Sequence, residues 1–153
     1  MTAACLLDTN ILLYLANPEA RKHFAAKAAV ARLLSGDERL VVAAQVLFEF
    51  WSVATRPVVA NGLGWSVARA RAEVDAIRGR FRVLEEPPAV IDLWLDMVVS
   101  HDLKGKRIHD AHLLATMKAN GVSRLLTCNA ADFPAESGIS VMTPDPRLLA
   151  SGL

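Results

Sequence analysis

Short apolar runs recur along this chain, and longer segments with helical character lie between them. The clearest runs are residues 4–8 (ACLLD), 40–44 (LVVAA) and 124–128 (RLLTC), with shorter ones at 81–84 and 139–142. A continuous apolar run of this length is typical of a strand that is covered on both faces. Such strands alternating with helices favour a parallel sheet. We therefore predict an α/β fold with three layers (α/β/α), in which a central, mostly parallel, twisted sheet has about five short strands.

Six segments between these runs are expected to be helical. Their limits follow from helix-breaking prolines at positions 18 and 57, a capping Ser66 and a terminating Gly121. The expected helices span residues 10–16, 19–34, 45–55, 66–78, 87–100 and 109–120. The two remaining stretches, 57–64 and 104–106, are expected to be loops.

Length and composition set the broad class. With 153 residues, of which 53% are hydrophobic and 22% charged, the chain is expected to fold as one domain over residues 1–153. No apolar run approaches the roughly 20 residues of a membrane span, and no secretory signal is evident. Its two cysteines, Cys5 and Cys128, are expected to be buried thiols in strands, which favours the cytoplasm. A net charge of +1 argues neither for nor against a nucleic-acid partner.

Three acidic residues stand where apolar residues would be expected. Asp8 ends the first strand, while Glu49 and Asp110 lie in helices among large apolar side chains. Each has an ordinary structural explanation: Asp8 and Asp110 as helix caps, and Glu49 as an ion-pair partner of Arg56. In an open parallel sheet, however, segments that follow the strands meet at one edge, so these acids are expected to converge there.

A fourth polar element follows the run at 124–128. Residues 125–134 (LLTCNAADFP) offer Asn129 as a neutral oxygen donor and Asp132 as a charged one, although Asp132 could equally form a local turn. Unpaired carboxylates held close together repel each other, so their cluster requires a positive partner. Hard oxygen ligands of this kind suit Mg²⁺ or Mn²⁺.

These stretches, taken in order, resemble the acidic motifs of PIN-domain nucleases. The resemblance rests on Asp8 in LLDTN, Glu49 in VLFEFWSVATRP, Asp110 in IHDAHLLATM, and TCNAADF, and it extends over about residues 5–144. The length, the order and the "TRP…NGL" pattern are most similar to the VapC-type toxins of bacterial toxin–antitoxin pairs. The resemblance implies a cytoplasmic, metal-dependent endoribonuclease that hydrolyses phosphodiester bonds in RNA. It also implies a homodimer and a small VapB-like antitoxin as partner.

The resemblance implies roles for individual residues. Asp8 and Asp110 would be direct ligands of Mg²⁺ or Mn²⁺, and Glu49 would be a ligand or would orient the attacking water. Asn129 stands where several members of the family carry an acid, so Asp132 is expected to supply that charge. These four acids form the expected catalytic set. Supporting hydrogen bonds are expected from Thr9, Asn10, Thr127 and Asn129, and contacts to RNA phosphates from Arg56, Lys104, Lys106 and Arg107.

Other interpretations of the same residues remain open. His109 and His112 could be imagined as a zinc site, but no cysteine or third histidine accompanies them. A phosphatase-like enzyme could use Asp8 as its nucleophile, although Asn10 occupies the position where a second acid would be needed. A third alternative is a non-catalytic RNA- or protein-binding module of the same fold.

Overall fold

The computed structural model describes residues 2–150 and contains a sheet of five strands, all parallel, in the order β3-β2-β1-β4-β5. The strands are β1 (Ala4–Leu7), β2 (Arg39–Ala43), β3 (Arg82–Leu84), β4 (Arg124–Leu126) and β5 (Ser140–Met142). In the register of the central strand, Leu6 lies between Val41 of β2 and Leu125 of β4. The predicted parallel sheet of five short strands is therefore confirmed.

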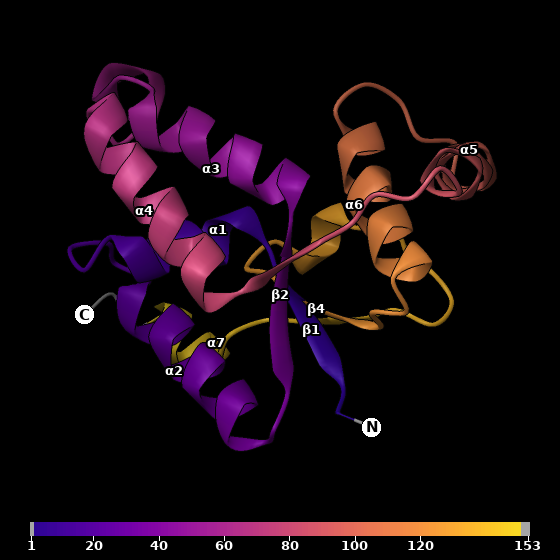
Figure 1. Cartoon of the computed structure of the whole chain (residues 1–153), viewed down its shortest axis with the longest axis horizontal. Helices are drawn as coiled ribbons and strands as arrows, with labels where there is room; N and C mark the ends of the chain where they lie inside the picture. Colours follow the sequence, from indigo (N-terminus) through magenta and orange to yellow (C-terminus); the bar gives the residue numbers. More distant parts are fainter. Residues whose placement is uncertain (1, 151–153) are drawn as a thin grey trace.

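Helices cover both faces of the sheet (Figure 1). They are α1 (Thr9–Ala16), α2 (His23–Ser35), α3 (Ala44–Thr55), α4 (Val67–Arg80), α5 (Val90–Ser100), α6 (Arg107–Ala119) and α7 (Pro146–Ala150). Figure 1 shows α5 and α6 on one side of the sheet and the other helices across it. Right-handed crossovers explain this division, because the chain moves outward from β1 to β3 and then returns to β4 in the opposite direction.

The central strand is the most deeply buried part of the molecule. Cys5, Leu6 and Leu7 have no solvent exposure, and Leu125 in the adjacent strand is equally buried. This burial on both faces is the reason for the unbroken apolar run in the sequence. Within residues 2–150, no helix combines the length and the apolar character that crossing a bilayer would require.

From β1 the chain adds β2 and β3 on one side of the sheet, and then β4 and β5 on the other side of β1. This change in strand order places a topological switch point at the carboxyl ends of β1 and β4. The backbone N–H of Asp8 donates to the Leu126 carbonyl (3.0 Å), and the N–H of Thr127 donates to Met142 (2.9 Å). The two segments that leave β1 and β4 are thus held side by side at this edge. In open α/β sheets, the crevice at such a point is the usual ligand site.

The end of α3 is closed by the segment that follows it. The backbone N–H groups of Leu63, Gly64 and Trp65 donate to carbonyls at residues 53, 56 and 54, at distances of 2.8 to 3.0 Å. These bonds satisfy carbonyl groups that the last turn of a helix leaves without partners. The expected loop at 57–64 therefore packs tightly and contains a 3₁₀ turn, η1 (Val58–Ala60).

Several boundaries differ from the predictions. The second helix begins at His23 rather than residue 19, because 17–20 form a turn through the Ala20 N–H and the Asn17 carbonyl (2.9 Å). The fifth begins at Val90, after the two prolines, and the sixth begins at Arg107 rather than residue 109. Helix α7 was not predicted.

Strand β4 is two residues shorter than predicted. β4 ends at Leu126 rather than residue 128, so Cys128 lies beyond the strand and is half-buried. Only Cys5 is a fully buried strand thiol as predicted.

Candidate active site

Asp8 follows β1 directly and caps α1. Its Oδ1 accepts a hydrogen bond from the backbone N–H of Thr9 (2.8 Å), and the residue is only 8% exposed. The structural explanation of Asp8 as a helix cap is therefore confirmed. It accounts for one carboxylate oxygen only, which leaves the second to be explained.

The second oxygen of Asp8 is held by two residues from opposite sides of the switch point. Oδ2 accepts hydrogen bonds from Thr127 Oγ1 (2.7 Å) and from Asn10 Nδ2 (3.2 Å). The Thr127 hydroxyl accepts in turn from Asn10 Nδ2 (3.1 Å) and from the N–H of Asn129 (3.0 Å). With one proton donated and two bonds accepted, the hydrogen-bonding capacity of this hydroxyl is fully used.

The amide of Asn10 completes the link between the two segments. Its Oδ1 accepts from the backbone N–H of Cys128 (3.0 Å), while its Nδ2 donates to Asp8 and Thr127. These contacts join residues almost 120 positions apart in the chain. Asn10 and Thr127 thus have the supporting positions near Asp8 that the sequence predicts.

Burial raises the pKa of Asp8 above its ordinary value. The hydrogen bonds from Thr127, Thr9 and Asn10 act in the opposite direction because they stabilise the ionised form, and the charge of Glu49 adds to the effect of burial. The hydrogen bonds therefore orient the Asp8 carboxylate and favour its ionised form, whereas burial and the charge of Glu49 oppose its ionisation.

Replacing Thr127 with Val is expected to destabilise the protein by about 1–3 kcal/mol. The side chain is fully buried, and its loss removes a donor to Asp8 and an acceptor for Asn10 and Asn129. Urea denaturation measures the change. Thr127→Ser keeps the hydroxyl and should retain more stability than Thr127→Val; equal losses in the two variants would contradict the role of the hydroxyl.

Glu49 lies on α3 with both carboxylate oxygens hydrogen-bonded. Thr9 Oγ1 donates to Oε2 (2.8 Å), and Gln45 Nε2 donates to Oε1 (3.1 Å). The proposed ion pair with Arg56 is not formed: Arg56 caps the far end of α3, and its Nη2 donates to the Asn61 carbonyl (3.2 Å). Arg56 follows Glu49 by seven positions, which corresponds to a rise of about 10 Å along a helix axis.

Asp110 lies in the first turn of α6 and is half-buried. It is not the helix cap, because the helix begins three residues before it. Its pKa is raised to about 6, first by burial and then by the charges of Asp132, Asp8 and Glu49, in that order, while Arg107 lowers it. Asp110 therefore lies near enough to the other three predicted acids for their charges to raise its pKa.

The two residues that could complete the site differ in their surroundings. Asp132, in the 3₁₀ turn η2 (Ala130–Asp132), has the largest electrostatic effect on Asp110 of the three neighbouring acids. Asn129 is exposed, and its backbone N–H contacts Thr127. Asp132 is therefore the charged residue of this turn that lies within electrostatic reach of Asp110.

The predicted cationic residues are exposed around α6. Lys104, Lys106 and Arg107 all lie on the surface, and Lys104 Nζ is 3.4 Å from Asp102. Within residues 2–150, no three histidine, cysteine or acidic side chains are close enough together to enclose a metal ion in this conformation. That statement covers His109 and His112 and equally Asp8, Glu49, Asp110 and Asp132, so the described side chains do not enclose an ion in this conformation.

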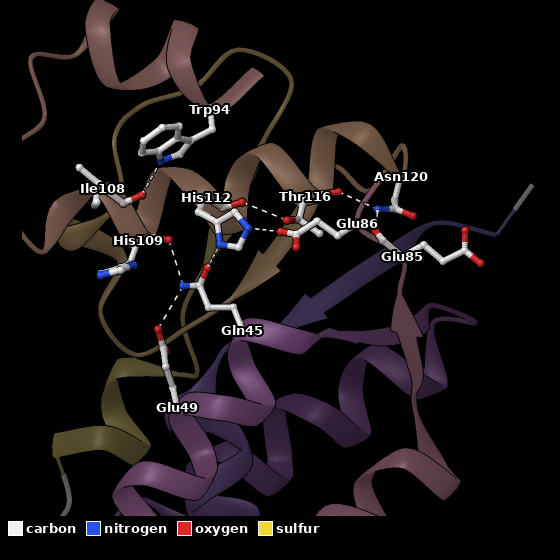
Figure 2. A network of polar contacts seen from close by, with 10 residues as sticks. All are labelled: Gln45, Glu49, Glu85, Glu86, Trp94, Ile108, His109, His112, Thr116 and Asn120. Atoms are coloured by element: carbon white, nitrogen blue, oxygen red, sulfur yellow. Dashed lines mark hydrogen bonds and ion pairs between the residues drawn. The ribbon is translucent and has the colours of Figure 1, made fainter. Parts of the chain in front are cut away.

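A further polar network was not predicted from the sequence. Figure 2 shows that Gln45, which binds Glu49, also contacts the His109 carbonyl and the ring of His112, and that this ring contacts Glu86. The only sequence signal was the spacing of Gln45 and Glu49, four residues apart on one helix.

Comparison with known proteins places these features in a family. Residues 5–135 match the family model described as the PIN domain. The chain is 29% identical over 128 residues to Ribonuclease VapC24 of Mycobacterium tuberculosis, covering 83% of this chain and 87% of that protein.

Solved structures share the fold. VapBC2 from Rickettsia felis, bound to a DNA fragment from its promoter, has a TM-score of 0.66 and 15% identity, covering 93% of this chain and 99% of the other. A toxin–antitoxin complex from Klebsiella pneumoniae has a TM-score of 0.62 and 23% identity, covering 92% and 98%.

Proposed function

Because the chain belongs to the PIN domain family, we propose that it is a metal-dependent endoribonuclease, which hydrolyses phosphodiester bonds in RNA. The observation that carries this proposal is that Asp110 lies within electrostatic reach of Asp132, Asp8 and Glu49, whose charges, together with burial, raise its pKa to about 6. Carboxylates whose charges interact in this way are stabilised by a bound cation.

The donor set fits Mg²⁺ or Mn²⁺. All of the predicted ligands are carboxylate oxygens, which these hard cations prefer. Asp8 Oδ2 already accepts two hydrogen bonds, whereas Oδ1 accepts one and keeps a lone pair for an ion. Asp8 and Asp110 would therefore hold the metal, with Glu49 as a further ligand or as the group that orients water. Asp132 would complete the rim of the site.

A bound divalent ion would lower the pKa of its water and offset the negative charge of the phosphate. The chain's own residues would set the geometry. Thr127 and Asn10 hold Asp8 in one orientation, and Thr9 and Gln45 hold Glu49. The exposed Lys104, Lys106 and Arg107 would attract RNA phosphates beside Asp110. Arg56 would contact RNA only at a distance from the acids, since it lies at the far end of α3.

A biological role follows from the relatives. A related ribonuclease carries the name VapC24, and the structures that share the fold include toxin–antitoxin complexes. We accordingly assign this chain the role of the toxin in such a pair, acting in the cytoplasm as a homodimer that a small VapB-like antitoxin restrains.

Metal removal tests the enzymatic proposal. Purified protein is expected to cut a labelled RNA with Mg²⁺ or Mn²⁺, and EDTA is expected to abolish cutting until excess Mn²⁺ is restored. Products are resolved on a denaturing gel. Cutting that persists in EDTA would contradict the metal requirement. RNA binding without cutting would favour a non-catalytic module, and a phosphoenzyme trapped on Asp8 would favour a phosphatase.

A further inference from the structure

The side chain of Gln45 joins the two helices that carry acidic residues. Its Nε2 donates to Glu49 Oε1 (3.1 Å) and to the backbone carbonyl of His109 (3.0 Å). His109 immediately precedes Asp110 in α6. One amide group, placed between α3 and α6, therefore connects the Glu49 carboxylate to the backbone beside Asp110 (Figure 2).

The orientation of this amide is determined by its partners. Both contacts of Nε2 are to oxygen acceptors, so the other end of the amide, Oε1, faces His112 Nδ1. In this arrangement Nδ1 is the donor, and because Nε2 of His112 faces the Glu86 carboxylate, both ring nitrogens would carry a proton. Reversing the amide would direct Oε1 at a carboxylate and a carbonyl, with no donor between them. The Gln45 side chain has one favourable orientation in this network.

His112 is itself held from the opposite side. Its Nε2 contacts Glu86 Oε1, and Thr116 Oγ1 donates to its backbone carbonyl (3.1 Å). The segment that carries Glu86 is fixed to α6 by Asn120, whose Nδ2 donates to the Glu85 carbonyl (2.8 Å). The chain of contacts thus runs from the segment after β3 through His112 to Gln45 and ends at Glu49.

We propose that Gln45 is a positioning residue for Glu49, and that His112 and Glu86 keep its amide in the orientation that this role requires. The inference rests on the proposed nuclease function. A glutamate side chain has three rotatable bonds, and fixing them before reaction removes an entropic cost from the reacting state. Partners that orient a carboxylate in this manner typically contribute 10- to 100-fold to metal affinity or activity.

Gln45→Met tests the role, since Met keeps the length of the side chain and has no amide donor. We expect kcat for RNA cleavage to fall on the order of tenfold, with less than a twofold change in KM. Trp94→Phe is the matched control: it removes the Trp94 Nε1 hydrogen bond to the Ile108 carbonyl (2.9 Å) on the same turn of α6 without touching Glu49. This control should lower Tm and leave kcat within twofold.

A double-mutant cycle separates positioning from general structural support. If Gln45 acts through Glu49, then Gln45→Met should change the single-turnover rate less than twofold in a Glu49→Gln background. A tenfold loss in both backgrounds would overturn the proposal. Gln45→Glu supplies a second variant, because its carboxylate cannot donate to Glu49 and adds a like charge, and it should lose more activity than Gln45→Met.

A measurement without RNA keeps the inference independent of the nuclease assignment. In metal-free, ¹⁵N-labelled protein, the side-chain amide signals of Gln45 are expected to shift in the Glu49→Gln and His112→Asn variants, and to stay unchanged in Trp94→Phe. Unshifted signals in the first two variants would overturn the proposal. Wild-type protein that cuts RNA while Gln45→Met cuts at the same rate would refute the positioning role alone. Absence of cutting by the wild type would refute the nuclease function alone.

Discussion

The Asp110→Asn variant is expected to lose at least about a hundredfold in RNA cleavage and yet to be more stable than the wild type without metal at neutral pH. The loss follows because a direct metal ligand should matter at least as much as the residues that merely orient one. The gain follows because Asn has no charge to be repelled by Asp132, Asp8 and Glu49, which raise the pKa of Asp110 together with burial.

The gain in stability should depend on pH in a defined direction. The pKa of Asp110 is 3.8 ordinarily and about 6 in the folded protein. Between these values the folded protein retains a proton that the unfolded chain has lost, so stability falls as the pH rises toward 6. Above pH 6 the full penalty is present, on the order of 1 kcal/mol after allowance for solvent screening, or about 2–4 °C in Tm.

Thermal unfolding in EDTA, compared at pH 7.5 and pH 4, measures this effect. The Asp110→Asn variant should exceed the wild type in Tm at pH 7.5, and the difference should shrink at pH 4, where the Asp110 carboxyl is protonated in the folded protein. Asp96→Asn, on the exposed surface of α5, is the control and should change neither Tm nor cleavage. A lower Tm for Asp110→Asn at pH 7.5 would show that Asp110 stabilises the fold instead.

Gly62→Ala is expected to reduce the free energy of unfolding by about 3 kcal/mol, the upper end of what overpacking normally costs. A Cβ at position 62 would lie 1.9 Å from the carbonyl oxygen of Arg56 and 2.3 Å from its carbonyl carbon. Both atoms belong to the backbone, so no side-chain rotation relieves the contact. Because Arg56 closes α3 and this helix carries Glu49, cleavage should weaken as well.

Gly79→Ala is the matched control for this substitution. Gly79 lies within α4, and a Cβ there meets nothing within 4 Å. Ala in place of a helical Gly is expected to stabilise the protein by about 0.5–1 kcal/mol. Urea denaturation of the two variants should therefore give changes of opposite sign. A Gly62→Ala variant as stable as the wild type would mean that the fold does not require the close approach of Gly62 to the backbone carbonyl of Arg56.

The sheet could be predicted because strand burial leaves a direct record in the sequence. Cys5, Leu6 and Leu7 are apolar since both faces of β1 are covered, and the same reasoning holds for Val42 and Leu125. Helix starts were harder to place. Residues 19–22 have no feature that separates a turn from a helix, and the tight packing at Gly62 depends on Arg56, which no local pattern reveals.

The acidic residues of the candidate site could be singled out from the sequence, because a carboxylate is conspicuous in an apolar setting. Asp8 and Asp110 stand out for this reason, whereas Gln45 and His112 do not. Amide and imidazole side chains are common on helix surfaces. The contact between Gln45 and His112 joins residues 67 positions apart in the chain, so no local pattern reveals it. The same limit explains why the predicted partner of Arg56 was wrong: its side chain donates to the Asn61 carbonyl and does not pair with Glu49.

The pairing of β1 with β4 has a consequence for synthesis of the chain. Asp8 is synthesised 119 residues before its buried partner Thr127. A ribosome-bound chain therefore lacks this partner of Asp8 until Thr127 has emerged. The hydrogen bond that orients the second oxygen of Asp8 is therefore acquired only after the segment that carries Thr127 has been synthesised.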